Sequence, residues 1–157
     1  MSTQPSLFAD AREVRIQRID QEILNLLTGI AGGPLGLRLT DDEREVLTMI
    51  RYHRGAASAI KLADIQQRTR LNVRTIKDAV RTLRMNFHLP IGSSKHAETG
   101  GYFLMISSED RAIWRKDVLD QARAQLAVLH ACDGRQAALE ALGQLRAELE
   151  SREESHA

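Results

Sequence analysis

The sequence lacks the residues that build disulfide frameworks, large aromatic cores or membrane spans. Its 157 residues include a single cysteine, Cys132, which excludes an internal disulfide and fits a reducing compartment such as the cytoplasm. Only 4% of the residues are aromatic, and no apolar run is long enough to cross a bilayer. The polar N-terminus does not have the pattern of a signal peptide. These absences predict a cytoplasmic, mostly helical protein without a membrane partner.

Patterns typical of catalytic and cofactor sites are also missing. The sequence shows no glycine-rich phosphate loop, no Ser-His-Asp set and no paired carboxylates. His130 and Cys132 lie close together, but no second pair accompanies them, and His53, His88 and His96 are scattered. These two candidate ligands are too few for a zinc site. We therefore expect neither an enzyme nor a bound cofactor or metal.

The pattern of the N-terminal quarter predicts a tail, one helix and a linker. Residues 1–10 are polar and predict a disordered tail. From Ala11 to Thr28 apolar residues recur every three or four positions, which predicts an amphipathic helix with Asp10 as its N-cap and with this buried stripe: Ile16, Ile19, Ile23, Leu26 and Leu27. Four glycines and a proline within residues 29–39 then predict a linker.

Residues 40–106 have the element order helix, short extended segment, helix, turn, helix, hairpin. Thr40 and Glu43 form a capping box before a helix whose buried face we expect to hold Val46, Leu47, Ile50 and Tyr52. An extended segment at 59–61 and a helix at 62–68 follow. After a turn at 69–71, Asn72 is placed to cap a helix over 73–87, with a buried stripe of Val73, Ile76, Val80, Leu83 and Phe87. Pro90 ends the helical pattern, and strands at 91–94 and 102–106 predict a β-hairpin.

The last third, residues 107–150, predicts two helices. Ser107 and Ser108 begin the first, and Asp133-Gly134 separates it from a second helix over about 136–150, with residues 151–157 frayed. Leu119, Ala122, Leu126 and Leu129 form a seam in the first helix, near Trp114 and Val118. Two interpretations stay open for this seam: packing within the chain, or a homodimer through these helices.

Basic charge is concentrated in one quarter of the chain. The net charge of +1 hides a balance of +6 over residues 61–96, where eight basic residues accompany two acidic ones. Residues 1–60 have a balance of −1 and residues 97–157 a balance of −4. A basic segment of this kind is the electrostatic pattern expected of a nucleic-acid surface.

The segment from Ile60 to Ile106 resembles the winged helix-turn-helix domains of the biotin-repressor type. The matching positions are Leu62-Ala63, Val73, Leu83-Arg84, Pro90-Ile91, Ser93, Gly101-Tyr102 and Leu104. The resemblance implies a mainly α fold with a small β-hairpin wing, flanked here by N- and C-terminal helices. It carries no biotin chemistry, because no ligase domain follows the wing.

Such a fold would present the polar side of the 73–87 helix to the major groove of double-stranded DNA. We expect Arg74 and Arg81 to read bases, and Arg70 and Lys95 to contact phosphates. The full set of candidate DNA-binding residues is Arg68, Arg70, Asn72, Arg74, Thr75, Lys77, Asp78, Arg81, Arg84, Lys95 and His96. This set predicts a small transcription regulator or a replication-associated factor of a phage or mobile element. The alternative is a winged helix that binds proteins and not DNA.

The tail carries a second candidate site, Gln4-Pro5-Ser6-Leu7-Phe8. It resembles the short peptides with which bacterial replication and repair proteins bind the sliding clamp. The resemblance implies that Leu7 and Phe8 fill an apolar pocket while Gln4 binds at its rim. The alternative is that Leu7 and Phe8 cover the chain's own first helix.

Overall fold

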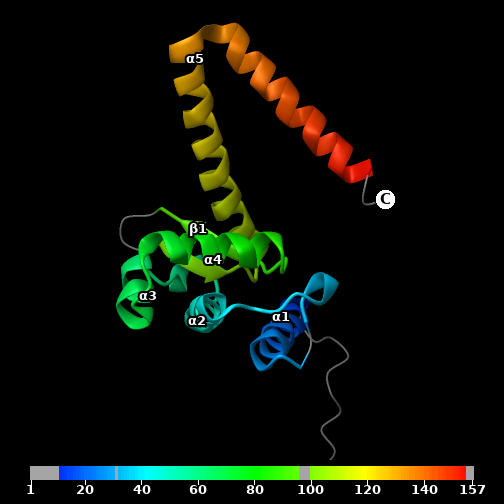
Figure 1. Ribbon diagram of the computed structural model, residues 1–157, viewed down its shortest axis with the longest axis vertical. Coiled ribbons are helices and arrows are strands. Elements are labelled where there is room, and N and C mark those ends of the chain that lie inside the picture. The colour runs from blue at the N-terminus through cyan, green and yellow to red at the C-terminus, as the bar shows by residue number, and fades with distance from the viewer. Residues whose placement is uncertain (1–10, 31, 96–99, 155–157) are drawn as a thin grey trace, which may run out of the picture. The chain divides into compact units, whose positions relative to one another are not determined.

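A computed structural model of the chain describes residues 11–30, 32–95 and 100–154 (Figure 1). The chain divides into two compact units, Met1–Arg115 and Lys116–Ala157. The described part is mainly helical, with one antiparallel pair of strands. None of its helices has the length and apolar character needed to cross a membrane. The tail residues Gln4, Leu7 and Phe8, the cap residue Asp10 and the hairpin residue His96 lie outside the described residues.

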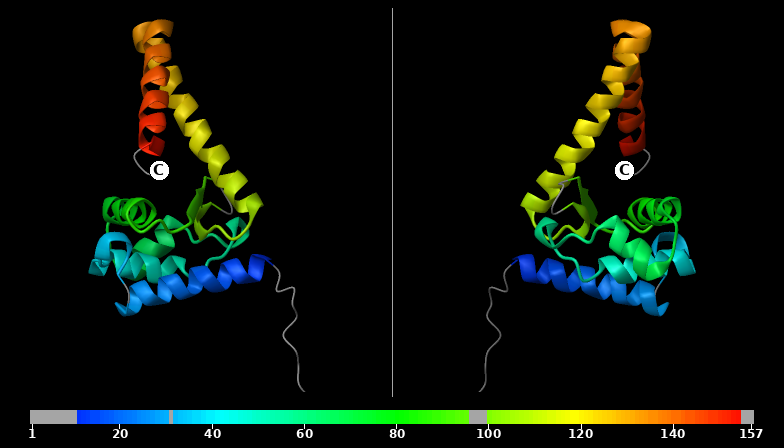
Figure 2. Two further views of the ribbon diagram at one scale, coloured as in Figure 1. Left: turned by 90° about the vertical axis from the view of Figure 1, so that its right-hand side faces the viewer. Right: turned by 90° about the vertical axis from the view of Figure 1, so that its left-hand side faces the viewer.

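Helix α1 (Ala11–Thr28) has the predicted bounds and buries Ile19, Ile23 and Leu26, whereas Ile16 and Leu27 are half-buried. A 3-10 turn, η1 (Pro34–Gly36), interrupts the linker that follows. Two polar contacts join α1 to α2 and to the segment that follows α2. Arg54 pairs with Asp20 at 2.5 Å, and the guanidinium of Arg44 donates a hydrogen bond to the carbonyl of Leu27. In both views of Figure 2, α1 (blue) runs beside the other elements of the first unit.

Helix α2 (Asp41–Ile50) begins with the predicted capping box. The Thr40 N–H donates to Glu43 Oε2 at 2.9 Å, and the Glu43 N–H donates to Thr40 Oγ1 at 3.3 Å. Val46, Leu47 and Ile50 are fully buried. The prediction that Tyr52 joins this face is wrong, because α2 ends at Ile50 and Tyr52 is 68% exposed, with the Arg51 guanidinium 4.6 Å from its ring centroid.

Helices α3 (Leu62–Thr69) and α4 (Val73–Met85) are joined by a tight turn. Arg70 adopts a left-handed backbone there (φ 59°), and Asn72 caps α4 by accepting a hydrogen bond from the Thr75 N–H at 2.9 Å. A further 3-10 turn, η2 (Ala56–Ser58), precedes α3.

The apolar stripe of α4 is buried, with two differences from the prediction. Ile76, Val80, Leu83 and Phe87 are buried as expected. Val73 is 37% exposed, because it is the first residue of α4 and lies at the edge of the core. The helix also ends at Met85 and not Phe87. The chain turns back just beyond, where His88 has φ 54° and the Leu89 N–H donates to the Leu83 carbonyl at 3.1 Å.

The strands β1 (Ile91–Ser94) and β2 (Gly101–Leu104) form the predicted hairpin, with Ile91 opposite Leu104 and Ser94 opposite Gly101. The second strand begins one residue earlier and ends two residues earlier than predicted. Ile60 pairs beside β2 through hydrogen bonds with Tyr102 at 2.8 and 2.9 Å. Only glycine fits at position 101, because a Cβ there would lie 2.1 Å from the Ile60 carbonyl oxygen.

Helix α5 (Ser108–Glu154) is broken at Gly134, whose backbone is non-helical (φ 89°, ψ 174°), so the predicted pair of helices is confirmed. The second helix continues to Glu154, beyond the predicted end at Glu150, and residues 155–157 are outside the described part. Residues 108–115 belong to the first unit and the rest of α5 to the second.

A buried carboxylate holds the start of α5. Asp110 is 6% exposed, and its side chain accepts hydrogen bonds from the N–H groups of Ala56 (2.9 Å), Ile106 (3.0 Å) and Ser107 (3.1 Å). Burial by itself raises the pKa of Asp110, but these hydrogen bonds outweigh it and hold the pKa below the ordinary value. Asp110 therefore joins η2, the end of the hairpin and α5.

We expect Asp110→Asn to lower the free energy of unfolding by about 2–3 kcal/mol at neutral pH, because the N–H donors lose a charged acceptor. Since the native pKa is lowered, the Asp110 contribution is complete above the ordinary aspartate pKa of about 4 and is lost as the pH falls through the native pKa. The difference between wild type and variant should therefore shrink in acid.

Urea unfolding between pH 7 and pH 3 measures this difference. The control is Asp42→Asn, the same chemical change at an exposed carboxylate in the first turn of α2, which should cost less than about 1 kcal/mol. Equal losses for the two variants, or a difference independent of pH, would contradict the role of Asp110.

Candidate nucleic-acid interface

The solvent side of α4 carries a row of charged residues. Arg74, Lys77, Asp78 and Arg81 are all exposed, on the side of α4 opposite Ile76, Val80 and Leu83. Arg74 and Asp78 approach to 3.8 Å, but both side chains are open to water, so the pair contributes little to stability. The face therefore keeps three cations and one carboxylate along about two turns of helix.

The N-terminal end of α4 and the turn before it add four of the candidate residues. The Asn72 side-chain oxygen is engaged as the helix cap, and Thr75 is half-buried. Arg68, at the end of α3, and Arg70, in the turn, are exposed. A hollow of about 300 Å³ lies beside them and is also lined by Arg44 of α2. The turn thus places two exposed guanidinium groups just before the α4 face.

The hairpin contributes one described candidate, Lys95, which follows β1 and is exposed. The other hairpin candidate, His96, lies outside the described residues. The structure therefore brings together residues from the turn and the helix, with Lys95 at the end of β1.

The prediction that Arg84 shares the exposed face of α4 is wrong. Its side chain is half-buried; Nε donates to the Ile91 carbonyl at 2.7 Å, and Nη2 donates to Ser93 Oγ at 3.2 Å. The guanidinium also lies over the Tyr102 and Trp114 rings, 5.9 and 5.6 Å from their centroids. Burial lowers the pKa of Arg84, and the nearby Tyr102 hydroxyl acts in the opposite direction.

Arg84 is a positioning residue that connects α4 to the hairpin. On a helical projection it falls at the border between the basic face and the buried stripe, so the spacing alone could not assign it. Trp114 and Tyr102 were not recognised as its partners from the sequence, because neither is near it in the chain.

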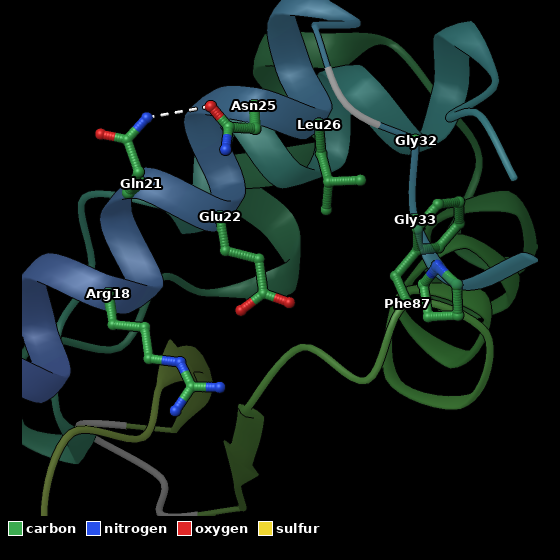
Figure 3. A pocket seen from close by; sticks show the side chains of 9 residues that line it. Arg18, Gln21, Glu22, Asn25, Leu26, Gly32, Gly33 and Phe87 are labelled. Carbon is green, nitrogen blue, oxygen red and sulfur yellow. Dashed lines mark hydrogen bonds between the residues drawn. The ribbon is translucent and has the colours of Figure 1, made fainter. Parts of the chain in front are cut away.

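Another hollow in the first unit lies away from these residues. It measures about 580 Å³ and lies between α1 and the linker, with Arg18, Glu22 and Asn25 on one side and Gly33 and Phe87 on the other (Figure 3). Its remaining lining residues are Gln21, Leu26, Gly32 and Pro34. Among the described residues, no group of three or more His, Cys, Asp or Glu side chains is placed to hold a metal ion.

Comparison with known proteins found no match to this chain among protein-family models, curated proteins or solved structures.

We expect Arg84→Met to lower the free energy of unfolding by about 1–3 kcal/mol. Methionine keeps an apolar stem but leaves the Ile91 carbonyl and the Ser93 hydroxyl without their donor. The matched control is Arg81→Met, one turn earlier on the exposed face, which should change stability by less than about 0.5 kcal/mol. Chemical denaturation followed by circular dichroism measures both variants, and a larger loss at Arg81 would show that the hairpin does not depend on Arg84.

Proposed function

We propose that this chain binds double-stranded DNA, with the exposed face of α4 in the major groove. The observation that carries the proposal is the one-sided basic face of α4, where Arg74, Lys77 and Arg81 lie opposite a fully buried stripe. A helix fits the major groove, and an arginine there can donate two parallel hydrogen bonds to guanine. In this proposal the three helices α2–α4 and the hairpin act as a winged helix-turn-helix.

The candidate residues then divide into two roles. Arg74 and Arg81 are assigned to base reading because they lie on the exposed side of α4, with Asn72 and Thr75 at the end that enters the groove. Arg68, Arg70, Lys77 and Lys95 are assigned to phosphates, which position the protein without reading sequence. Asp78 adds a carboxylate that can accept a hydrogen bond from cytosine. Arg84 makes no direct contact with DNA in this assignment, because its side-chain N–H groups donate hydrogen bonds within the chain.

The proposed biological role is that of a small regulator of transcription or a replication-associated factor. A protein-binding domain is the competing interpretation, and it would leave the basic face of α4 without a DNA partner. The same binding experiment separates the two.

We expect the chain to bind duplex DNA with an affinity that falls steeply as salt rises, by about 0.9 log units per log unit of salt for each phosphate contact. Arg74→Ala/Arg81→Ala should weaken binding at least tenfold. The matched control is Arg15→Ala/Arg18→Ala, which removes two exposed arginines from α1 and should bind like wild type. Fluorescence anisotropy on a labelled duplex measures all three proteins. Equal binding by the two variants, or no salt-dependent binding by wild type, would rule out the α4 face.

Base reading and phosphate binding are distinguished by single variants. Loss of the base-reading Arg74 should cost about 1–3 kcal/mol on the preferred site and weaken the preference for that site. Loss of Arg70 should lower affinity by a similar factor on every duplex and reduce the salt dependence. Selection of sites from a random duplex pool, repeated with Arg74→Ala and Arg70→Ala, measures the preference. A preference altered only by Arg70→Ala would show that the two roles are reversed.

A further inference from the structure

The second unit has no interior of its own. Among its described side chains, residues 116–152, none is buried. Seven of its large apolar side chains are between 44% and 64% exposed: Val118, Leu119, Val128, Leu139, Leu142, Leu145 and Leu149. Most of the stability of a helix in a protein comes from the packing of its apolar face. These helices therefore need a partner surface.

The apolar residues follow the spacing of helices that pack along their length. In the first half of the unit the spacing is three, four, three: Leu119, Ala122, Leu126 and Leu129. After the break at Gly134 it is four, three, four: Ala138, Leu142, Leu145 and Leu149. Alternating steps of three and four residues are the pattern of coiled coils and helical bundles.

The two halves cover each other only in part. Near the break, Leu126, Leu129, Ala138 and Ala141 are half-buried. Further along the second half, Leu142, Leu145 and Leu149 stay exposed and form a continuous apolar strip. The uncovered strip is therefore on the second half of the unit.

The paired charged side chains of the unit lie outside this strip. Arg146 pairs with Glu150 at 2.7 Å, and Asp120 pairs with Lys116 at 3.0 Å and with Arg123 at 3.2 Å, each within one helix and exposed. On a helical projection these residues lie beside the two apolar rows and not within them. Covering the rows would therefore remove few charges from water, so little of the hydrophobic gain would be offset.

We propose that a second copy of this chain covers the strip, so that the leucine rows of the two copies pack against each other. In a two-fold dimer the same surface of both copies forms the interface, so that surface must be complementary to itself. An uncharged row of leucines meets this requirement. The second half of the unit is about 27 Å long, so a second copy lying along it can cover the whole leucine row.

This dimer does not require DNA binding, but it extends the proposed function. Helix-turn-helix dimers place two recognition helices on paired half-sites of a two-fold symmetric target. The second unit would then set the oligomeric state, while the first unit contacts DNA.

The test is the mass of the full chain without DNA, measured by sedimentation equilibrium from about 0.1 to 50 μM. We expect twice the chain mass of 17.6 kDa at the upper end and dissociation on dilution. Leu142→Ala/Leu145→Ala should raise the dissociation constant at least tenfold while keeping the helices, since alanine is the best helix former. Leu142→Glu/Leu145→Glu should give the mass of a single chain.

The matched control is Ala147→Glu/Ser151→Glu, which adds the same charge to the opposite, exposed side of the same helix and should leave the dimer intact. A wild-type chain that stays single at 50 μM would overturn the proposal and leave the strip to the first unit or to another protein. Dimers that persist unchanged in both leucine variants would place the interface elsewhere. Arg74→Ala/Arg81→Ala should remain dimeric, so loss of DNA binding and loss of dimerisation are separate results.

Discussion

The packing of α4 against α2 is the contact on which the rest of the first unit depends. Ile76, Val80 and Leu83 share one core with the fully buried apolar residues of α2. Because one side of α4 is committed to this core, its opposite side must face solvent, and that side holds Arg74, Lys77 and Arg81. The same burial that stabilises the fold therefore determines which charges are available to a partner.

Two partly or fully buried charged groups attach the remaining elements to this core. Arg84 connects the end of α4 to the first strand of the hairpin and to the Trp114 ring. Asp110 joins the start of α5 to η2 and to the residues that follow the second strand. Each uses its charge to bind backbone groups at a chain reversal, where regular hydrogen bonding ends. Within the described residues, no buried side-chain polar atom lacks a hydrogen-bond partner.

The two units expose different kinds of surface. The first has a buried core and a basic face, whereas the described part of the second has exposed leucine rows and charges paired along each helix. A protein that binds a two-fold symmetric duplex needs both properties, a charged surface for the polyanion and an apolar surface for its own copy. The proposed DNA contact and the proposed dimer thus assign a use to each surface.

Local patterns in the sequence determined most of the element boundaries. The Thr40–Glu43 capping box, the Asn72 cap, the break at Gly134 and the stripe of α4 were all predictable, because they depend on residues within a few positions of one another. Helical spacing also assigned three of the basic residues to the solvent side.

Tertiary structure decided the features that depend on residues far apart in the sequence. Tyr52 is exposed because α2 ends before it, and Val73 because it lies at the edge of the core. Arg84 turns inward because the hairpin, several residues later, returns beside it with a carbonyl, a hydroxyl and an aromatic ring. The spacing of apolar residues predicts which side of a helix is buried. The contacts of a residue at the border of that side depend on which distant parts of the folded chain pack beside it.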